Sequence, residues 1–365
     1  MTNLFNQIGI TNEETEARIR ECFEQMFFDD DEKIWHDVDV DSACMVDTGN
    51  IDARTEGMSY GMMMCVQMDR QDMFDKLWQF SKRYMYQSEG KHRGYFAWSV
   101  GLDGRHNAEG PAPDGEEYFA MALFMAQARW GDGEGIFAYG DQAREILRHC
   151  LHQPQMVPGG SAMWDADNHY IKFVPEVNYT DPSYHLPHFY ELFALKADEC
   201  DRPFWKQAAE ASRRYIALSA HPITGMSPEY AHYDGTPILQ FGKDYAYYSD
   251  AYRVALNIAL DHIWFGATPE MDDVASRLQA WMQANADPND YRAWDLDGTP
   301  HDEPAMHPVA ITAVLAAASA VTGDRECLKR FWDTPLRKGK RRYYDNCLYF
   351  FALLLLAGKY EMWVK

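Results

Sequence analysis

Residues 347–357 read CLYFFALLLLA and residues 310–318 read AITAVLAAA, and neither stretch carries a charged residue. A helix at the surface of a protein shows a polar face, whereas these two stretches are apolar all round. The first is too short to span a bilayer, which needs about 20 residues. A helix that is apolar on every side must be covered by other elements. Both stretches therefore predict inner helices of an all-α protein that has a second, outer layer.

Helical periodicity recurs along the whole chain, between loops rich in Gly, Pro, Asn and Asp. We expect helices near residues 12–28, 54–68, 71–86, 115–130, 139–152, 182–199, 203–219, 246–265, 269–284, 306–322, 324–332 and 343–357. Two concentric rings of helices, as in an (α/α)6 barrel, would cover the apolar ones. A helical solenoid is the alternative, but no fixed repeat period is visible.

No low-complexity linker or charge block divides the sequence, so a single domain over residues 1–365 is expected. Short strands are expected only in loops, for example around Tyr170–Phe173. The formal net charge of −22 disfavours nucleic acids and anionic membranes as partners, because both would be repelled. The N-terminus lacks the pattern of a signal peptide, and the seven cysteines are scattered without a CxxC spacing. These features predict a cytoplasmic protein with reduced thiols.

Three acids lie within or beside apolar helices, where a carboxylate is unexpected because burying an unpaired charge is costly. Glu56 opens an apolar helix and is followed by a glycine that would let a ligand approach. It is either an acid that protonates a leaving group or a first-turn residue favoured by the helix dipole. Asp114 precedes a helix and has the position of an N-cap, which can also face a cavity. Asp250 and Arg253 are three residues apart and could form an ion pair on one helix face. Asp250 could instead be a carboxylate that activates water, with Arg253 orienting it.

Aromatic residues are abundant beside the turns, as in the segment YFAW that ends at Trp98. Sugar rings stack on aromatic planes through their apolar C–H faces, so this mixture of aromatic and polar residues suits an oligosaccharide groove. Any single aromatic is also a plausible core residue. No metal site is expected, since no tight Cys/His set or HExxH motif is present, and no nucleotide-binding glycine loop is found. We therefore expect no cofactor.

The three acid-bearing segments together resemble motifs of glycoside hydrolase family 8. The stretch RTEGMSYGM at 54–62 resembles the family's S/T-E-G-x-x-Y-G-M motif. The stretch APDGE at 112–116 resembles its A-x-D-G-D/E segment, and DAYR at 250–253 resembles its D-A-x-R motif. The resemblance extends from about residue 40 to the C-terminus. It implies an (α/α)6 barrel that hydrolyses β-1,4 linkages with inversion.

Carried over by motif, the resemblance implies that Glu56 is the general acid and Asp250 the general base. Asp114 would bind the distorted sugar at the cleavage point. Four further residues would complete the substrate-binding set. Tyr184 would hold the attacking water, and Trp98 would stack on a sugar. Arg253 would orient the base, and His307 would lie on the leaving-group side.

Within the family, the chain is most similar to the enzymes that release xylose from the reducing end of xylo-oligosaccharides. These carry a Leu-His-Pro stretch that blocks the leaving-group side of the cleft, and Met306-His307-Pro308 occupies that place here. Methionine replaces leucine with a similar volume. The alternatives are an endo-acting xylanase, cellulase or chitosanase of the family, a non-catalytic oligosaccharide-binding protein, and an isomerase or epimerase that uses His185, His188 and His307.

Overall fold

The computed structural model describes residues 2–243 and 245–364. By its internal contacts the chain falls into two compact units. The first unit contains residues 2–24, 178–188 and 208–360, and the second contains residues 25–177, 189–207 and 361–364. Each unit is described below by itself.

The described residues are mostly helical, as the sequence predicted. The α-helices are α1 (Asn12–Phe27), α2 (Thr55–Gln67), α3 (Gln71–Phe80), α4 (Pro113–Trp130), α5 (Tyr139–Met156), α6 (Pro187–Lys196), α7 (Arg202–Ser219), α8 (Arg253–Phe265), α9 (Pro269–Asn285), α10 (Pro308–Ala317), α11 (Ser319–Thr322), α12 (Arg325–Asp333) and α13 (Arg342–Leu356). Every predicted helix has a counterpart in this set. Among the described residues, no helix is both long and apolar enough to cross a membrane.

The first turn of α1 shows why the helix starts where the sequence predicted. The hydroxyl of Thr11 accepts the backbone N–H of Glu14 at 3.2 Å, while the carboxylate of Glu14 accepts the N–H of Thr11 at 2.8 Å. This reciprocal pair is a capping box, which satisfies two N–H groups that a helix start leaves without partners.

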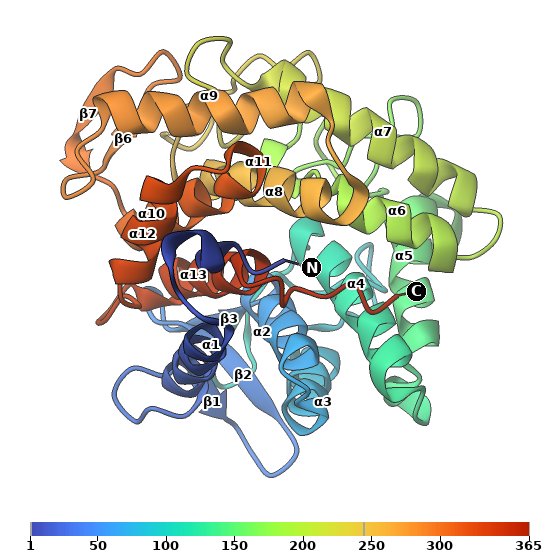
Figure 1. The fold of residues 1–365 in the computed structure, drawn as a ribbon. Coiled ribbons are helices and arrows are strands. Elements are labelled where there is room, and N and C mark those ends of the chain that lie inside the picture. Colours follow the sequence, from blue (N-terminus) through green and yellow to red (C-terminus); the bar gives the residue numbers. More distant parts are fainter. Residues whose placement is uncertain (1, 244, 365) are drawn as a thin grey trace. The chain divides into compact units, whose positions relative to one another are not determined.

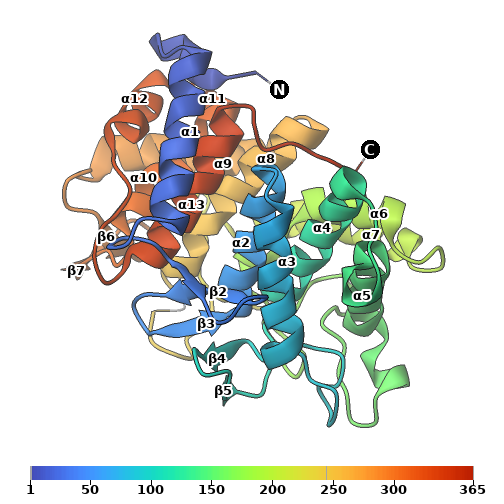
Figure 2. The ribbon, with the colours of Figure 1, turned by 90° about the horizontal axis from the view of Figure 1, so that it is seen from below.

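The second unit holds a five-stranded antiparallel sheet that the sequence did not predict. Its strands are β1 (Trp35–Asp37), β2 (Ala43–Asp47), β3 (Asp52–Arg54), β4 (Ser99–Gly101) and β5 (His106–Ala108), in that spatial order. Strand β3 runs straight into α2, which packs beside α3 and α4 (Figure 2). At Gly61 of α2 an added Cβ would lie 2.6 Å from Met45 and 2.8 Å from Leu77, so the sheet, α2 and α3 are in close contact.

The first unit is built around α8, α9, α10 and α13 (Figure 1). Helix α10 packs against α13, and these two contain the apolar stretches that predicted inner helices; the described side chains of both stretches are buried. The alanines of α10 let the two helices approach closely. A hairpin of β6 (Arg292–Trp294) and β7 (Pro300–Pro304) follows α9.

Four predicted helices are interrupted, and one of them, expected over 306–322, divides at Ala318 into α10 and α11. The helix expected over 182–199 divides into a 3-10 turn at Pro182–Tyr184 and α6, because Pro187 pushes the residue before it out of the helical region. The one expected over 246–265 begins with a 3-10 turn at Ser249–Tyr252, and the one expected over 71–86 ends in a π-helical turn at Ser81–Met85. Near the strand expected at 170–173, only an isolated bridge between Trp164 and Ile171 is present.

Candidate active site

Glu56 stands in the first turn of α2, directly after β3. The sheet fixes this turn, because the N–H of Thr55 donates to the carbonyl oxygen of Trp98 at 2.9 Å. The carboxyl group lies near the positive end of the helix dipole. Glu56 is half-buried, so its backbone is anchored while its side chain stays accessible.

Asp114 stands in the first turn of α4, beside the first turn of α2. The two turns touch because Gly115 presents no side chain to Thr55. Glu56 and Asp114 therefore occupy adjacent helix starts. The expectation that Asp114 is an N-cap is wrong: Ala112 is the N-cap, and Pro113 takes the first helical position, where its fixed φ suits a helix start. Asp114 is inside the helix and is only 6% exposed.

Trp98 is a half-exposed aromatic ring near these two acids. The guanidinium of Arg54 lies over its ring, 5.3 Å from the centroid, and is itself held by Asp47 at 3.1 Å and Asp52 at 3.2 Å. The backbone N–H of Trp98 donates to the carbonyl oxygen of Gly110 at 3.0 Å. A ring that is fixed in this way and 36% exposed can serve as a platform for a sugar face.

Two further acids of α4 were missed by the sequence reasoning, Glu116 and Glu117. Both are fully buried. Glu116 accepts the backbone N–H of Phe96 at 3.0 Å, and burial raises its pKa well above the usual range, with the charge of Asp114 adding to the effect. Glu117 accepts the hydroxyl of Tyr190 at 2.9 Å. The signal was available, since two acids after Asp114 enter a helix that is otherwise apolar.

In the first unit, Asp250 and Arg253 form the ion pair that their spacing predicted. Nη2 of Arg253 lies 3.4 Å from Oδ1 of Asp250 and also 3.4 Å from Oδ2 of Asp181. Asp181 is fully buried, and burial raises its pKa well above the usual range; the charge of Asp250 adds to this and that of Arg253 opposes it. The side chain of Asp250 is 25% exposed, so water can reach it.

Tyr184 belongs to the same cluster. The guanidinium of Arg253 lies 5.3 Å from the centroid of its ring, and Nε of Arg253 donates to the hydroxyl of Ser183 at 3.0 Å. The side chain of Asn257 donates to the carbonyl oxygen of Ser183 at 2.8 Å. Helix α8 therefore fixes the turn that carries Tyr184, and the structure brings Tyr184, Arg253 and Asp250 together.

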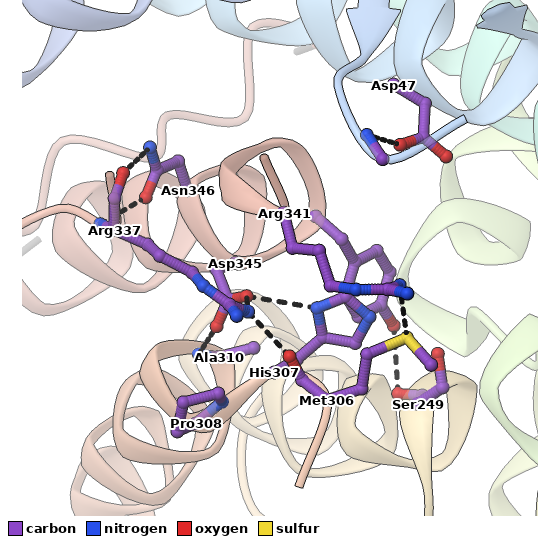
Figure 3. A network of polar contacts seen from close by, with 12 residues as sticks. Asp47, Ser249, Met306, His307, Pro308, Ala310, Arg337, Arg341, Asp345 and Asn346 are labelled. Carbon is purple, nitrogen blue, oxygen red and sulfur yellow. Dashed lines mark hydrogen bonds and ion pairs between the residues drawn. The ribbon is translucent and has the colours of Figure 1, made fainter. Parts of the chain in front are cut away.

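His307 precedes α10 and is held by a buried carboxylate (Figure 3). The carboxylate of Asp345 accepts a hydrogen bond from Nδ1 of His307 at 3.0 Å and another from the backbone N–H of Ala310 at 2.8 Å. It also forms an ion pair with Arg337. A carboxylate only accepts hydrogen bonds, so the ring carries its hydrogen on Nδ1 and leaves Nε2 as its second polar atom. Beside it, the guanidinium of Arg341 contacts the sulfur of Met306 at 3.0 Å.

The site residues fall into two groups. Glu56, Asp114 and Trp98 lie in the second unit, whereas Asp250, Arg253, Tyr184 and His307 lie in the first. A family model described as glycosyl hydrolases family 8 matches residues 37–358. The chain belongs to glycosyl hydrolase family 8.

This family 8 hydrolase is similar to characterised relatives over nearly its whole length. It is 52% identical to the reducing end xylose-releasing exo-oligoxylanase of Halalkalibacterium halodurans, covering 99% of this chain and 94% of the relative. It is 51% identical to the reducing-end xylose-releasing exo-oligoxylanase Rex8A of Paenibacillus barcinonensis, covering 99% and 96%. Endoglucanase A of Acetivibrio thermocellus is more distant, with 25% identity over 85% of this chain and 63% of the relative.

The solved structures place the family 8 hydrolase in its fold class. The structure of Rex8A complexed with xylose matches it with a TM-score of 0.97 at 51% identity, covering 99% of this chain and 97% of the other. The expected (α/α)6 barrel is thereby confirmed, with the short sheets as additions to an all-α fold.

Two histidines considered for isomerase chemistry are core residues in this hydrolase. His185 and His188 are fully buried, and burial lowers the pKa of each to about 3. His185 lies between the hydroxyls of Thr180 and Ser212 and stacks on Tyr215. Rings that stay neutral and have no access to solvent do not suit proton exchange with a substrate. In the described part of the chain, no group of three or more His, Cys, Asp or Glu side chains is arranged to hold a metal.

Proposed function

We propose that this family 8 hydrolase releases xylose from the reducing end of β-1,4-linked xylo-oligosaccharides, with inversion at the anomeric carbon. The similarity to enzymes named for this activity, at about half identity over the whole chain, carries the proposal. A neutral oligosaccharide also suits a protein whose net charge of −22 disfavours anionic ligands.

In the proposed reaction, Glu56 donates its proton to the glycosidic oxygen as the bond from that oxygen to the anomeric carbon breaks. A water molecule attacks the opposite face of the same carbon, and Asp250 accepts the proton that the water releases. Inverting enzymes hold these two carboxyl groups about 6.5–9.5 Å apart, which leaves room for the water. The products are xylose and a shortened chain with the opposite anomeric configuration.

The other site residues support these two. Arg253 orients Asp250 through their ion pair, in which Nη2 of Arg253 lies 3.4 Å from Oδ1 of Asp250. Tyr184, packed on the same guanidinium, aims the water. Asp114 binds hydroxyls of the distorted ring, and Trp98 stacks on a neighbouring sugar.

His307 and Met306 give the proposed reaction its preference for the chain end. His307 is fixed by Asp345 with Nε2 as its remaining polar atom, which suits a hydroxyl of the leaving xylose. Met306, in contact with Arg341, would block the cleft beyond this sugar. A substrate could then extend only one residue past the cleavage point.

Digestion of xylotetraose labelled at its reducing end tests the proposal. The label should leave as free xylose in the first turnover, and proton NMR should show the α-anomer of the new chain end before mutarotation. Release of labelled xylobiose at the outset would indicate an endo-acting family member instead. Binding measured by calorimetry without any hydrolysis would indicate a non-catalytic binding protein.

We also propose that the enzyme works in the cytoplasm. The structure shows no disulfide bond among the described cysteines, and six of the seven are buried. Free thiols are typical of a reducing compartment, and short xylo-oligosaccharides are substrates that a cell can import. Cell fractionation with detection of the native protein tests this; recovery in the culture medium would contradict it.

A further inference from the structure

The general base assigned above stands on an unusual piece of backbone. Ser249, the residue before Asp250, has a φ of +23°, in a region that residues with a side chain rarely adopt. Such a conformation persists only where the surroundings impose it, and it is concentrated at functional sites.

Two side chains hold the peptide unit between Ser249 and Asp250 from opposite ends. The hydroxyl of Tyr344 donates to the carbonyl oxygen of Ser249 at 3.0 Å. The backbone N–H of Asp250 donates to Oε1 of Glu229 at 3.1 Å. Tyr344 is 6% exposed and Glu229 is 9% exposed, so both hydrogen bonds are sheltered from competing water. The plane of this peptide, and with it the direction of the Asp250 side chain, is thus fixed at both ends.

Tyr344 has a second contact, with the residue assigned to the leaving-group side. Its ring centroid lies 4.7 Å from that of His307. The next residue of α13 is Asp345, whose carboxylate holds Nδ1 of His307 (Figure 3). The first turn of α13 therefore fixes His307 through Asp345 and the backbone of the base through Tyr344.

We propose that Tyr344 and Glu229 are positioning residues for the base Asp250, and that Tyr344 ties this base to the histidine beside the leaving xylose. This inference rests on the proposed function, because it takes Asp250 as the group that activates water. Neither residue touches the reacting atoms. Their effect is to hold the carboxylate at the angle required for proton transfer, where small displacements are costly.

Tyr344→Phe is the main test, because it removes one hydroxyl and keeps the ring on His307. With xylotriose, kcat should fall about 10–100-fold while KM changes less than about threefold, since only the alignment of the base is lost. Glu229→Ala should also lower kcat for xylotriose with little change in KM. Glu229→Gln retains a carbonyl oxygen as acceptor for the N–H of Asp250 and should restore most of kcat.

Tyr252→Phe is the matched control. Tyr252 is fully buried two residues from Asp250, and its hydroxyl has no hydrogen-bond partner among the described residues. Its loss should leave kcat within about twofold of the wild type. An equal loss of kcat in Tyr252→Phe and Tyr344→Phe would overturn the inference, because the effect would then be one of packing.

Asp250→Asn separates this inference from the proposed function. If that variant is inactive while Tyr344→Phe and Glu229→Ala keep full kcat, the positioning role is wrong and the base assignment stands. If Asp250→Asn itself keeps more than about a tenth of wild-type kcat, the base assignment is wrong. Should Glu229→Ala fail to fold, Tyr344→Phe and Glu229→Gln decide the outcome.

Discussion

Gly115 of α4 lies against Thr55 of α2 with no space for a side chain between them. A Cβ on Gly115 would overlap the Cβ and Oγ1 of Thr55 and lie 3.3 Å from its carbonyl carbon. The neighbours of these two residues are Asp114 and Glu56. This contact therefore sets the spacing between Asp114 and Glu56, which we propose as the sugar-binding acid and the general acid.

Gly115→Ala should push the two helix starts apart. We expect a loss of about 1–3 kcal/mol in the free energy of unfolding, as for other overpacked sites, together with a lower kcat on xylotriose. Urea unfolding and initial rates measure the two effects. Gly110→Ala is the control, since a Cβ there meets nothing within 4 Å. Equal behaviour of the two variants would refute the spacing role.

Glu56→Gln should abolish hydrolysis of xylotriose, with a loss of at least about 100-fold in kcat, because amides do not donate a proton to the leaving oxygen. β-Xylobiosyl fluoride should still be hydrolysed at a rate close to that of the wild type, since fluoride leaves without protonation. Fluoride release and xylose release are measured on the same samples. Parallel loss of both activities would speak against Glu56 as the acid.

Glu116→Gln should leave activity nearly unchanged. Burial raises the pKa of Glu116 well above its usual range and so favours its protonated form, which glutamine resembles, and glutamine keeps an oxygen for the N–H of Phe96. Glu116→Ala removes that acceptor and should lower kcat/KM, because Phe96 leads to Trp98. A severe loss in the glutamine variant would show that the charged form is required.

Asp345→Asn should lower the free energy of unfolding and weaken the hydrogen bond that fixes the His307 ring. Asp345 is fully buried and pairs with Arg337, and breaking such a pair costs about 3–5 kcal/mol. Thermal unfolding measures this loss. The His307 ring also loses its fixed hydrogen on Nδ1, so KM for xylotriose should rise. A variant with unchanged KM would argue against His307 as a sugar contact.

The stability of the enzyme should fall as the pH decreases from about 6.5 towards 3. Burial lowers the pKa of His188 to about 3, and that of His185 to the same value. Between these pH values the unfolded chain binds protons at both histidines, whereas the native chain does not. The contribution of the two histidines to the free energy of unfolding is therefore fully present above about pH 6.5 and is lost as the pH decreases below that value. Urea unfolding at several pH values should give a shallower slope for His188→Asn. An unchanged slope would contradict the assignment.

The sequence predicted the helices because their apolar residues recur with the helical period over several turns. It missed the five-stranded sheet because strands as short as β1 and β3, with three residues each, show no alternation. It placed the start of α4 two residues late, since Pro113 opens the helix ahead of Asp114.

The site was predictable only in part. The ion pair of Asp250 and Arg253 follows from local spacing, and the family motifs supplied the roles proposed for the acids. The partners that hold these residues are distant in sequence: Asp345 lies 38 residues from His307, and Tyr344 lies 95 residues from Ser249. No local pattern marks such pairs, because only the folded chain brings them into contact.

The junction of β3 and α2 has no connecting residue, since Arg54 ends the strand and Thr55 starts the helix. Inserting or deleting one residue here would rotate every side chain of α2 by about 100° relative to the sheet. The direction of the Glu56 side chain would change with it. Libraries that vary loop length to change the products of this enzyme should therefore leave this junction intact.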